Sequence, residues 1–176
     1  MSCRDVTRKV ARLMSRHLVS SMSLPVADFQ TNRPLVTWPS TNFESALKAA
    51  PYRLARRWKS LKWRQDQVLW IAPRGIELFG GFGGRLRQRL QLQHDLGTAQ
   101  VFLKQGQEDQ SHWMGEDWLR QTDSKLTLLR KVPDAVIRDQ HERLSKAVEF
   151  GGRYSRRSLN QFSRHCMKLG LPYEIW

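Results

Sequence analysis

The sequence feature that most constrains the fold is an alternation of side chains over residues 85–96. Leucines recur at the even positions, and the odd positions begin with Arg85, Arg87 and Arg89. A period of two is typical of a half-buried strand, because successive side chains leave opposite faces of a strand. A Gly-Thr pair then predicts a turn before a returning strand at 99–104. We therefore expect a β-hairpin with three arginines on its outer face; the competing interpretation is an Arg-rich helix.

The charge balance limits the classes of partner. The 176 residues include 30 Lys and Arg against 16 Asp and Glu, a formal net charge of +14. Such an excess indicates a polyanionic partner, usually nucleic acid and less often a membrane surface. Small subunits of large assemblies can be equally basic, so that alternative stays open. Two cysteines without pair spacing predict neither a disulfide nor a zinc cluster, and no apolar run is long enough to span a membrane.

The N-terminal 40 residues are predicted to be a basic arm followed by a proline-containing linker. Residues 1–23 are rich in Arg and Ser, and Asp5 is their only acid. The same composition is typical of an organellar transit peptide. We expect instead that this segment stays on the protein as an arm or short helix. Residues 24–40 hold three prolines and little periodicity, so we interpret them as extended.

A single domain is predicted from residue 41 to residue 176. Thr41 and Glu44 have the spacing of a capping box, which predicts a helix start, and Pro51 is expected to interrupt that helix. The next segment predicts a second amphipathic helix. Its polar side carries aromatic rings among cations, a pattern that suits stacking on unpaired bases. The residues of that segment with a proposed binding role are Arg53, Arg56, Lys59 and Trp63. Trp63 could equally have left the helix and pack in the core.

The middle of the chain predicts an α+β fold. Residues 67–72 favour a buried strand, the next three a turn, and 76–79 a short second strand. The glycine-rich run 80–84 lacks the Gly-Lys-Ser/Thr ending of a phosphate-binding loop, so we interpret it as a connection. Together with the hairpin, this predicts a small antiparallel sheet of three or four strands packed with N-terminal and long C-terminal helices.

The acidic segment 108–123 carries no catalytic or metal-binding pattern. It contains carboxylates and His112, but no His pair flanks a Glu at helical spacing, and no calcium-loop motif occurs. We therefore predict no catalytic residue, no metal and no cofactor, and we expect a protein that is not an enzyme. Trp113, Trp118 and this acidic segment are the candidate contacts for protein partners.

The C-terminal third predicts one long helical seam over residues 137–169. Apolar residues recur there at steps of three and four, and His141 and Cys166 fall among them as expected core residues. A Gly-Gly pair in the middle indicates either a close approach of another backbone or a bend between two helices. The opposite side is basic, and its candidate anion-binding residues are Arg153, Arg157 and Arg164.

Several short motifs resemble those of a known family. They are Arg89-Leu90, Gly97-Thr98, Phe102-Leu103-Lys104, Met114-Gly115 with Trp118, and Leu159-Asn160-Gln161 with Cys166. Over residues 86–169 the chain resembles a family of small proteins of unknown function that are encoded on bacterial integrating conjugative elements. The resemblance implies a bacterial cytoplasmic protein in element transfer, maintenance or replication, and it implies no functional residue.

The sequence as a whole therefore favours a non-enzymatic nucleic-acid-binding accessory protein, with DNA favoured over RNA. The expected contacts are three basic surfaces, at Arg85–Arg89, on the helix before Trp63, and on the helix after Arg153. The alternative is a protein-interaction subunit of a larger assembly. A cytoplasmic location in a bacterium is expected, or an organelle if residues 1–23 are a transit peptide.

Overall fold

The computed structural model describes residues 3–29, 32–81, 89–122, 132–152 and 154–176. The chain forms two compact units, and each takes in residues from both sides of position 40. Unit 1 consists of Met1–Asp28 and Lys62–Leu92, and unit 2 of Phe29–Leu61 and Gln93–Trp176. No helix of the described residues is long and apolar enough to cross a membrane.

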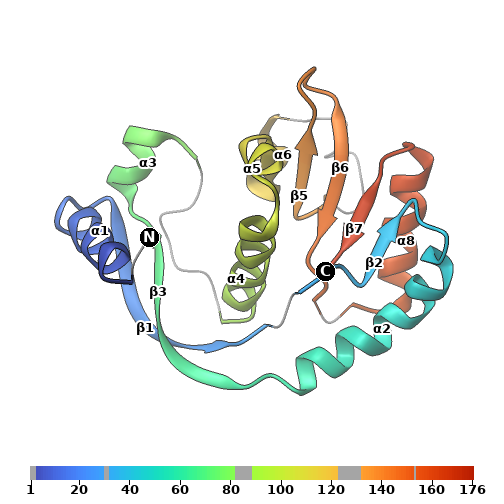
Figure 1. The fold of residues 1–176 in the computed structure, drawn as a ribbon, viewed down its shortest axis with the longest axis horizontal. Coiled ribbons are helices and arrows are strands. Elements are labelled where there is room, and N and C mark those ends of the chain that lie inside the picture. Colours follow the sequence, from blue (N-terminus) through green and yellow to red (C-terminus); the bar gives the residue numbers. More distant parts are fainter. Residues whose placement is uncertain (1–2, 30–31, 82–88, 123–131, 153) are drawn as a thin grey trace. The chain divides into compact units, whose positions relative to one another are not determined.

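Unit 1 is built on a two-stranded ribbon. Its elements are α1 (Cys3–Ser15), β1 (Val19–Ala27), β3 (Trp63–Ile71) and α3 (Pro73–Phe79). β1 and β3 pair antiparallel along their whole length (Figure 1). The strand expected at 67–72 is therefore confirmed as part of β3, although only Val68 of β3 is fully buried. The arm expected from the first residues is a helix, α1.

The turn and short strand expected after β3 are wrong, because residues 73–79 form the helix α3. Pro73 stands in its first turn, where the missing N–H of proline costs nothing. Gly75 lies so close to unit 1's backbone that a Cβ there would be 2.5 Å from the Leu18 carbonyl oxygen. Gly75, which the sequence places in a turn, lies instead inside a helix at a close contact with the backbone of Leu18.

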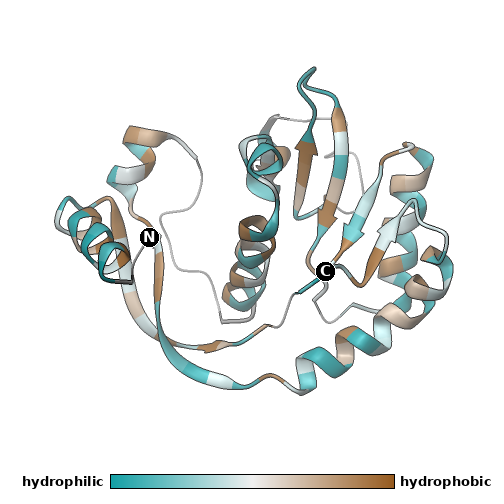
Figure 2. Cartoon of the chain, in the orientation of Figure 1, coloured by the Kyte–Doolittle hydropathy of each residue, from teal (hydrophilic) through white to brown (hydrophobic). Residues whose placement is uncertain are grey.

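Unit 2 contains a five-stranded mixed sheet. Its strands are β2 (Val36–Trp38), β4 (Trp113–Gly115), β5 (Ala135–Arg138), β6 (Leu144–Glu149) and β7 (Tyr173–Ile175). Their order is β2-β7-β6-β5-β4, with β6 and β7 parallel and the other neighbours antiparallel. The α+β class is thus confirmed, whereas a small antiparallel sheet of three or four strands is wrong. The hydrophobic residues of β5 contrast with the hydrophilic loop that leads to β6 (Figure 2).

Helices cover both faces of this sheet. One face packs on α2 (Phe43–Lys59) and α8 (Arg156–Lys168), and its core includes Leu54, Leu159, Phe162 and Tyr173. α6 (Glu116–Thr122) packs Leu119 against Val136 on the same face. The other face carries Lys146, whose Nζ bonds to Gln105 and to Asp109. Gln105 directly follows α4 (Arg89–Lys104), and Asp109 belongs to α5 (Gln107–Ser111).

The hairpin expected at 85–104 is wrong: residues 89–104 form one helix, α4. Leu92 and Gln93 are both buried although they are adjacent, which a strand with one exposed face does not allow. Gly97 lies inside α4 rather than in a turn. The Phe150 ring packs so closely against it that there is no room for a Cβ. Arg85 and Arg87 lie outside the described residues, and Arg89 is the first residue of α4.

The long C-terminal seam is also wrong, since residues 133–169 contain β5, β6 and α8. His141 is exposed in the turn between the two strands, where Asp139 Oδ1 accepts backbone N–H groups of His141 and Arg143. These bonds lower the pKa of Asp139. Cys166 is buried, as expected. A backbone does approach the Gly-Gly pair closely: Gly151 N–H donates to the Trp176 carbonyl at 2.9 Å.

Two further expectations fail in the N-terminal half. α2 runs through Pro51 without a break, and its N-cap is Asn42, which makes no side-chain capping bond; the capping box of Thr41 and Glu44 is therefore absent. The segment 24–40, expected to be a linker, contributes the end of β1 and all of β2. Residues of this segment form strands because β1 pairs with β3 and β2 pairs with β7, and both partners are distant in sequence.

The close approach of Phe150 to α4 predicts a stability effect at Gly97. A Cβ at Gly97 would lie 2.2 Å from the Phe150 ring. Gly97→Ala is therefore expected to lower the free energy of unfolding by about 1 to 3 kcal/mol, although alanine is the better helix former by about 1 kcal/mol. Urea unfolding followed by tryptophan fluorescence measures this change.

Gly115→Ala is the matched control, because nothing lies within 4 Å of a Cβ at Gly115. In a helix without such a contact, replacing glycine by alanine raises stability. A Gly97→Ala protein that is more stable than the unchanged chain would therefore contradict the packing of Phe150 against Gly97.

Candidate nucleic-acid interface

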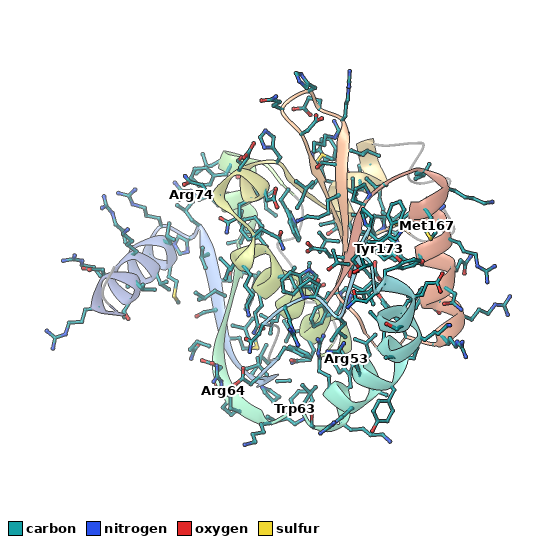
Figure 3. The ribbon with its side chains drawn as sticks, turned by 45° about the vertical axis from the view of Figure 1, so that its right-hand side comes forward. Arg53, Trp63, Arg64, Arg74, Met167 and Tyr173 are labelled. Atoms are coloured by element: carbon teal, nitrogen blue, oxygen red, sulfur yellow. The ribbon has the colours of Figure 1, made fainter. Side chains whose placement is uncertain are left out.

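The outer sides of α2 and α8 form one basic surface of unit 2, the α2–α8 basic face. Each helix buries one side: α2 through Ala50 and Leu54, and α8 through Leu159, Phe162 and Cys166. Many of the remaining positions are exposed, including those of Arg53 on α2 and Met167 on α8 (Figure 3). Their exposed cations are Lys48, Arg53, Arg56 and Lys59 on α2, and Arg156, Arg157, Arg164 and Lys168 on α8. The only acid in the two helices is Glu44.

These eight cations lack the ion pairs that several other described cations form. Elsewhere the ion pairs include Arg64 with Asp66, Arg120 with Glu116, and Lys146 with Asp109 and Glu174. Within the described part of the chain, no cation of the α2–α8 basic face forms such a pair. Uncompensated like charges on neighbouring helices repel one another, so the surface is unfavourable unless an anion binds.

A groove of about 340 Å³ lies where the two helices meet. Phe43, Leu47 and Met167 supply its apolar lining, and Lys48, Arg156 and Arg164 supply its cations. Glu44, Asn160 and Ser163 are the other lining residues. Ser163 is already engaged, because Tyr173 Oη donates to its Oγ at 2.8 Å. The groove thus combines an apolar surface with three positive charges.

One exposed aromatic residue lies among the cations of α2. Tyr52 is 72% exposed and stands one helical turn after Lys48 and one before Arg56. Its ring is therefore available for stacking. Trp58 on the same helix is half-buried and donates Nε1–H to the Gly151 carbonyl at 3.1 Å, which holds α2 to the segment that follows β6. Trp63, expected beside these residues, starts β3 in unit 1 and is 58% exposed.

The candidate residues from the sequence include five of the eight cations of the α2–α8 basic face. Arg53, Arg56 and Lys59 lie together on α2, and Arg157 and Arg164 lie together on α8. Arg153 lies outside the described residues. Lys48, Arg156 and Lys168 were not among the candidates. Continuing the periodicity of α2 back through Pro51 would have found Lys48, which is two turns before Arg56 on the same side of the helix.

A second group of charged side chains is buried where β5 and β6 meet α4. His94 Nε2 lies 3.2 Å from Asp134 Oδ2, and that oxygen also accepts the Phe150 N–H at 2.7 Å. Glu149 is fully buried nearby, and the Arg57 guanidinium lies 5.9 Å from the centre of the Phe150 ring. Asp134 and Glu149 come together only because β5 and β6 pair through Ala135 and Val148.

The pKa values in this cluster follow from burial and its two carboxylates. Burial alone would lower the pKa of His94, but hydrogen bonds to Asp134 and Asp95 and the charges of Asp134 and Glu149 raise it to about 10. Burial, and then the charge of Glu149, raises the pKa of Tyr154. Burial, and then the charge of Arg53, lowers the pKa of Arg57. At neutral pH His94 is already protonated, so it cannot act as a general base.

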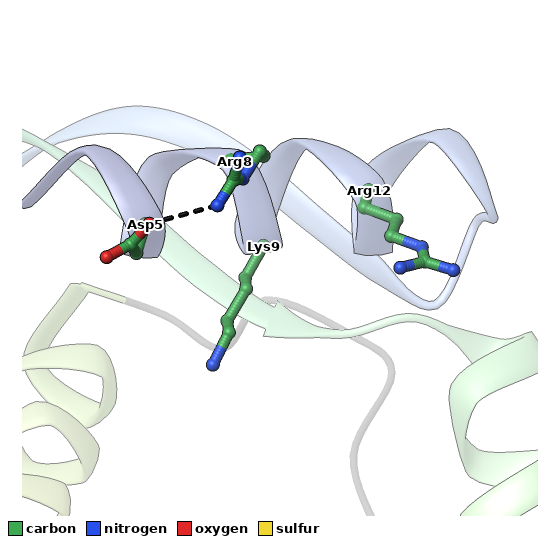
Figure 4. Close-up of a pocket in the computed structure, with 4 residues that line it drawn as sticks. All are labelled: Asp5, Arg8, Lys9 and Arg12. Atoms are coloured by element: carbon green, nitrogen blue, oxygen red, sulfur yellow. Dashed lines mark hydrogen bonds and ion pairs between the residues drawn. The ribbon is translucent and has the colours of Figure 1, made fainter. Parts of the chain in front are cut away.

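The described residues contain no candidate metal site and one smaller basic cluster. Among the described residues, no group of three or more His, Cys, Asp and Glu side chains could hold a metal ion. A smaller basic cluster lies on α1, where Asp5 pairs with Arg8 at 3.0 Å beside Lys9 and Arg12 (Figure 4). Because one acid already pairs within this cluster, its charge is partly compensated.

The segment expected to contact protein partners is mostly part of unit 2's own packing. Trp113 packs edge-on against Phe102, and Asp109 pairs with Lys146. Trp118 is 37% exposed and has the Arg138 guanidinium 5.5 Å from the centre of its ring. The protein-partner role of this segment stays a prediction.

Comparison with known proteins adds no relative. No family model, no curated protein and no solved structure matches the chain. The resemblance to the conjugative-element family therefore stays a prediction.

The ion pair of His94 predicts a pH dependence of stability. The His94 pKa is raised from 6.5 to about 10 in the folded chain, so the charged ring stabilises the fold in full below pH 6.5. That contribution is lost as the pH rises through about 10. The stability difference between the unchanged chain and His94→Gln is expected to be largest near pH 6.5 and to shrink towards pH 10. Urea unfolding across this range measures it, and a constant difference would contradict the ion pair.

Proposed function

We propose that the protein binds nucleic acid through the α2–α8 basic face, as a non-enzymatic accessory protein. The observation that carries this proposal is the set of eight exposed cations that no described acid pairs. The sugar-phosphate backbone is the abundant polyanion of matching shape, because its charges repeat along a line as those of a helix surface do. DNA in a bacterial cytoplasm, in the setting of a mobile element, is the favoured ligand.

The start of α8 supports the same proposal. Arg156 and Arg157 stand in its first turn, with no acid beside them. The N-terminus of a helix carries a partial positive charge, so two arginines there oppose the stability of the helix. The same arrangement attracts a phosphate, which can accept backbone N–H groups and guanidinium groups together. A contact with phosphate explains this otherwise unfavourable placement.

The proposal predicts a salt-dependent affinity that depends on particular arginines. Binding of a labelled DNA to the full chain is expected to weaken steeply as salt rises. The double change Arg157→Gln with Arg164→Gln should weaken binding and reduce the log–log salt slope by about 0.7 to 0.9 for each lost phosphate contact. Fluorescence anisotropy titrations at several salt concentrations give both quantities.

Arg120→Gln serves as the control, since Arg120 is an exposed arginine of unit 2 that pairs with Glu116 instead. The proposal fails if the unchanged chain binds neither single- nor double-stranded DNA or RNA at low salt, or if Arg120→Gln weakens binding as much as the double change.

A further inference from the structure

We propose that the α2–α8 basic face takes single-stranded nucleic acid, with one unpaired base in the groove between the helices and another stacked on Tyr52. This inference rests on the nucleic-acid binding proposed above and specifies the form of the ligand. It depends on two features that a duplex does not need: an exposed aromatic ring among cations, and an apolar hollow edged by positive charge.

The groove has the size and the lining for one nucleotide. Its volume of about 340 Å³ is at the low end of the range for small-molecule sites. Phe43, Leu47 and Met167 offer an apolar surface to the flat face of a base. Lys48, Arg156 and Arg164 place positive charge around that surface, where the phosphates on either side of the base would lie. A base paired inside a duplex cannot reach such a hollow.

The hydrogen-bonding groups of the groove fit the edge of a base better than they fit a phosphate. Asn160 can both donate and accept, and the Glu44 carboxylate only accepts. A carboxylate repels a phosphate but accepts the exocyclic amine of a base. Glu44 therefore favours a base in the groove, with the phosphates held outside by the surrounding cations.

Tyr52 supplies a second contact at a suitable distance along α2. Lys48, which lines the groove, is four positions before Tyr52, so the two residues lie on the same side of α2 and about 6 Å apart along its axis. That rise is about two stacked nucleotides at 3.4 Å each. Arg53 and Arg56 continue the positive surface past Tyr52. A strand of a few nucleotides can thus contact the groove, Tyr52 and these cations at once.

The test compares one DNA strand of about 16 nucleotides with its blunt duplex, using the full chain, equal salt and fluorescence anisotropy. The single strand is expected to bind at least about tenfold more tightly. Tyr52→Ala should weaken single-strand binding about tenfold and leave duplex binding unchanged, while Tyr52→Trp, which keeps a stacking surface, should retain it. Phe43→Leu keeps the apolar volume, removes the ring in the groove and should weaken single-strand binding as well.

Phe79→Ala is the matched control. Phe79 and Tyr52 are almost equally exposed, at 73% and 72%, but Phe79 lies on α3 of unit 1. Equal or tighter binding of the duplex would overturn the inference while leaving nucleic-acid binding intact. Unchanged single-strand affinity in both Tyr52→Ala and Phe43→Leu would overturn it too. Failure of the unchanged chain to bind DNA or RNA, whether single- or double-stranded, would instead sink the proposed function itself.

Discussion

The parallel pairing of β6 with β7 is the constraint on which the rest of unit 2 depends. Two parallel strands need a long connection that crosses one face of the sheet, and α8 is that connection. Its inner side must be apolar, so Phe162 packs edge-on against Tyr173 while the Tyr173 hydroxyl donates to Ser163. The outer side is then left to polar residues, and α2 extends it. The position of the α2–α8 basic face thus follows from sheet topology, but its charge does not.

Charges inside unit 2 and charges on this face follow opposite rules. Inside, His94 and Asp134 lie 3.2 Å apart, because a buried charge without a partner costs several kcal/mol. On the α2–α8 basic face, arginines and lysines stand on adjacent helices and form no ion pair with a described acid. Selection for stability alone would have paired or removed some of them. Their accumulation on one surface, beside an apolar groove and an exposed tyrosine, is better explained by an anionic ligand that carries flat rings.

How much the sequence predicted depended on whether the signal was local. Helical spacing brought Arg53 and Arg56 together, and Arg157 and Arg164, because three and seven residues make about one and two turns. The alternation before Gly97 led to a wrong prediction of a strand, because its leucines have the spacing of a strand pattern. The burial of the adjacent Leu92 and Gln93 depends instead on packing within the folded chain. The meeting of Asp134 with Glu149, and the groove between α2 and α8, arise from strand pairing and helix packing between distant segments. No local pattern contains that information.

The most direct test of the central claim is to map the bound oligonucleotide on the folded chain. Hydrogen–deuterium exchange of the full chain, with and without a single DNA strand at low salt, reports which backbone amides become protected. Protection is expected at the N-terminal turns of α2 and α8, where Phe43, Lys48 and Arg156 line the groove. Protection confined to α1 and the β1–β3 ribbon, with α2 and α8 unchanged, would contradict it.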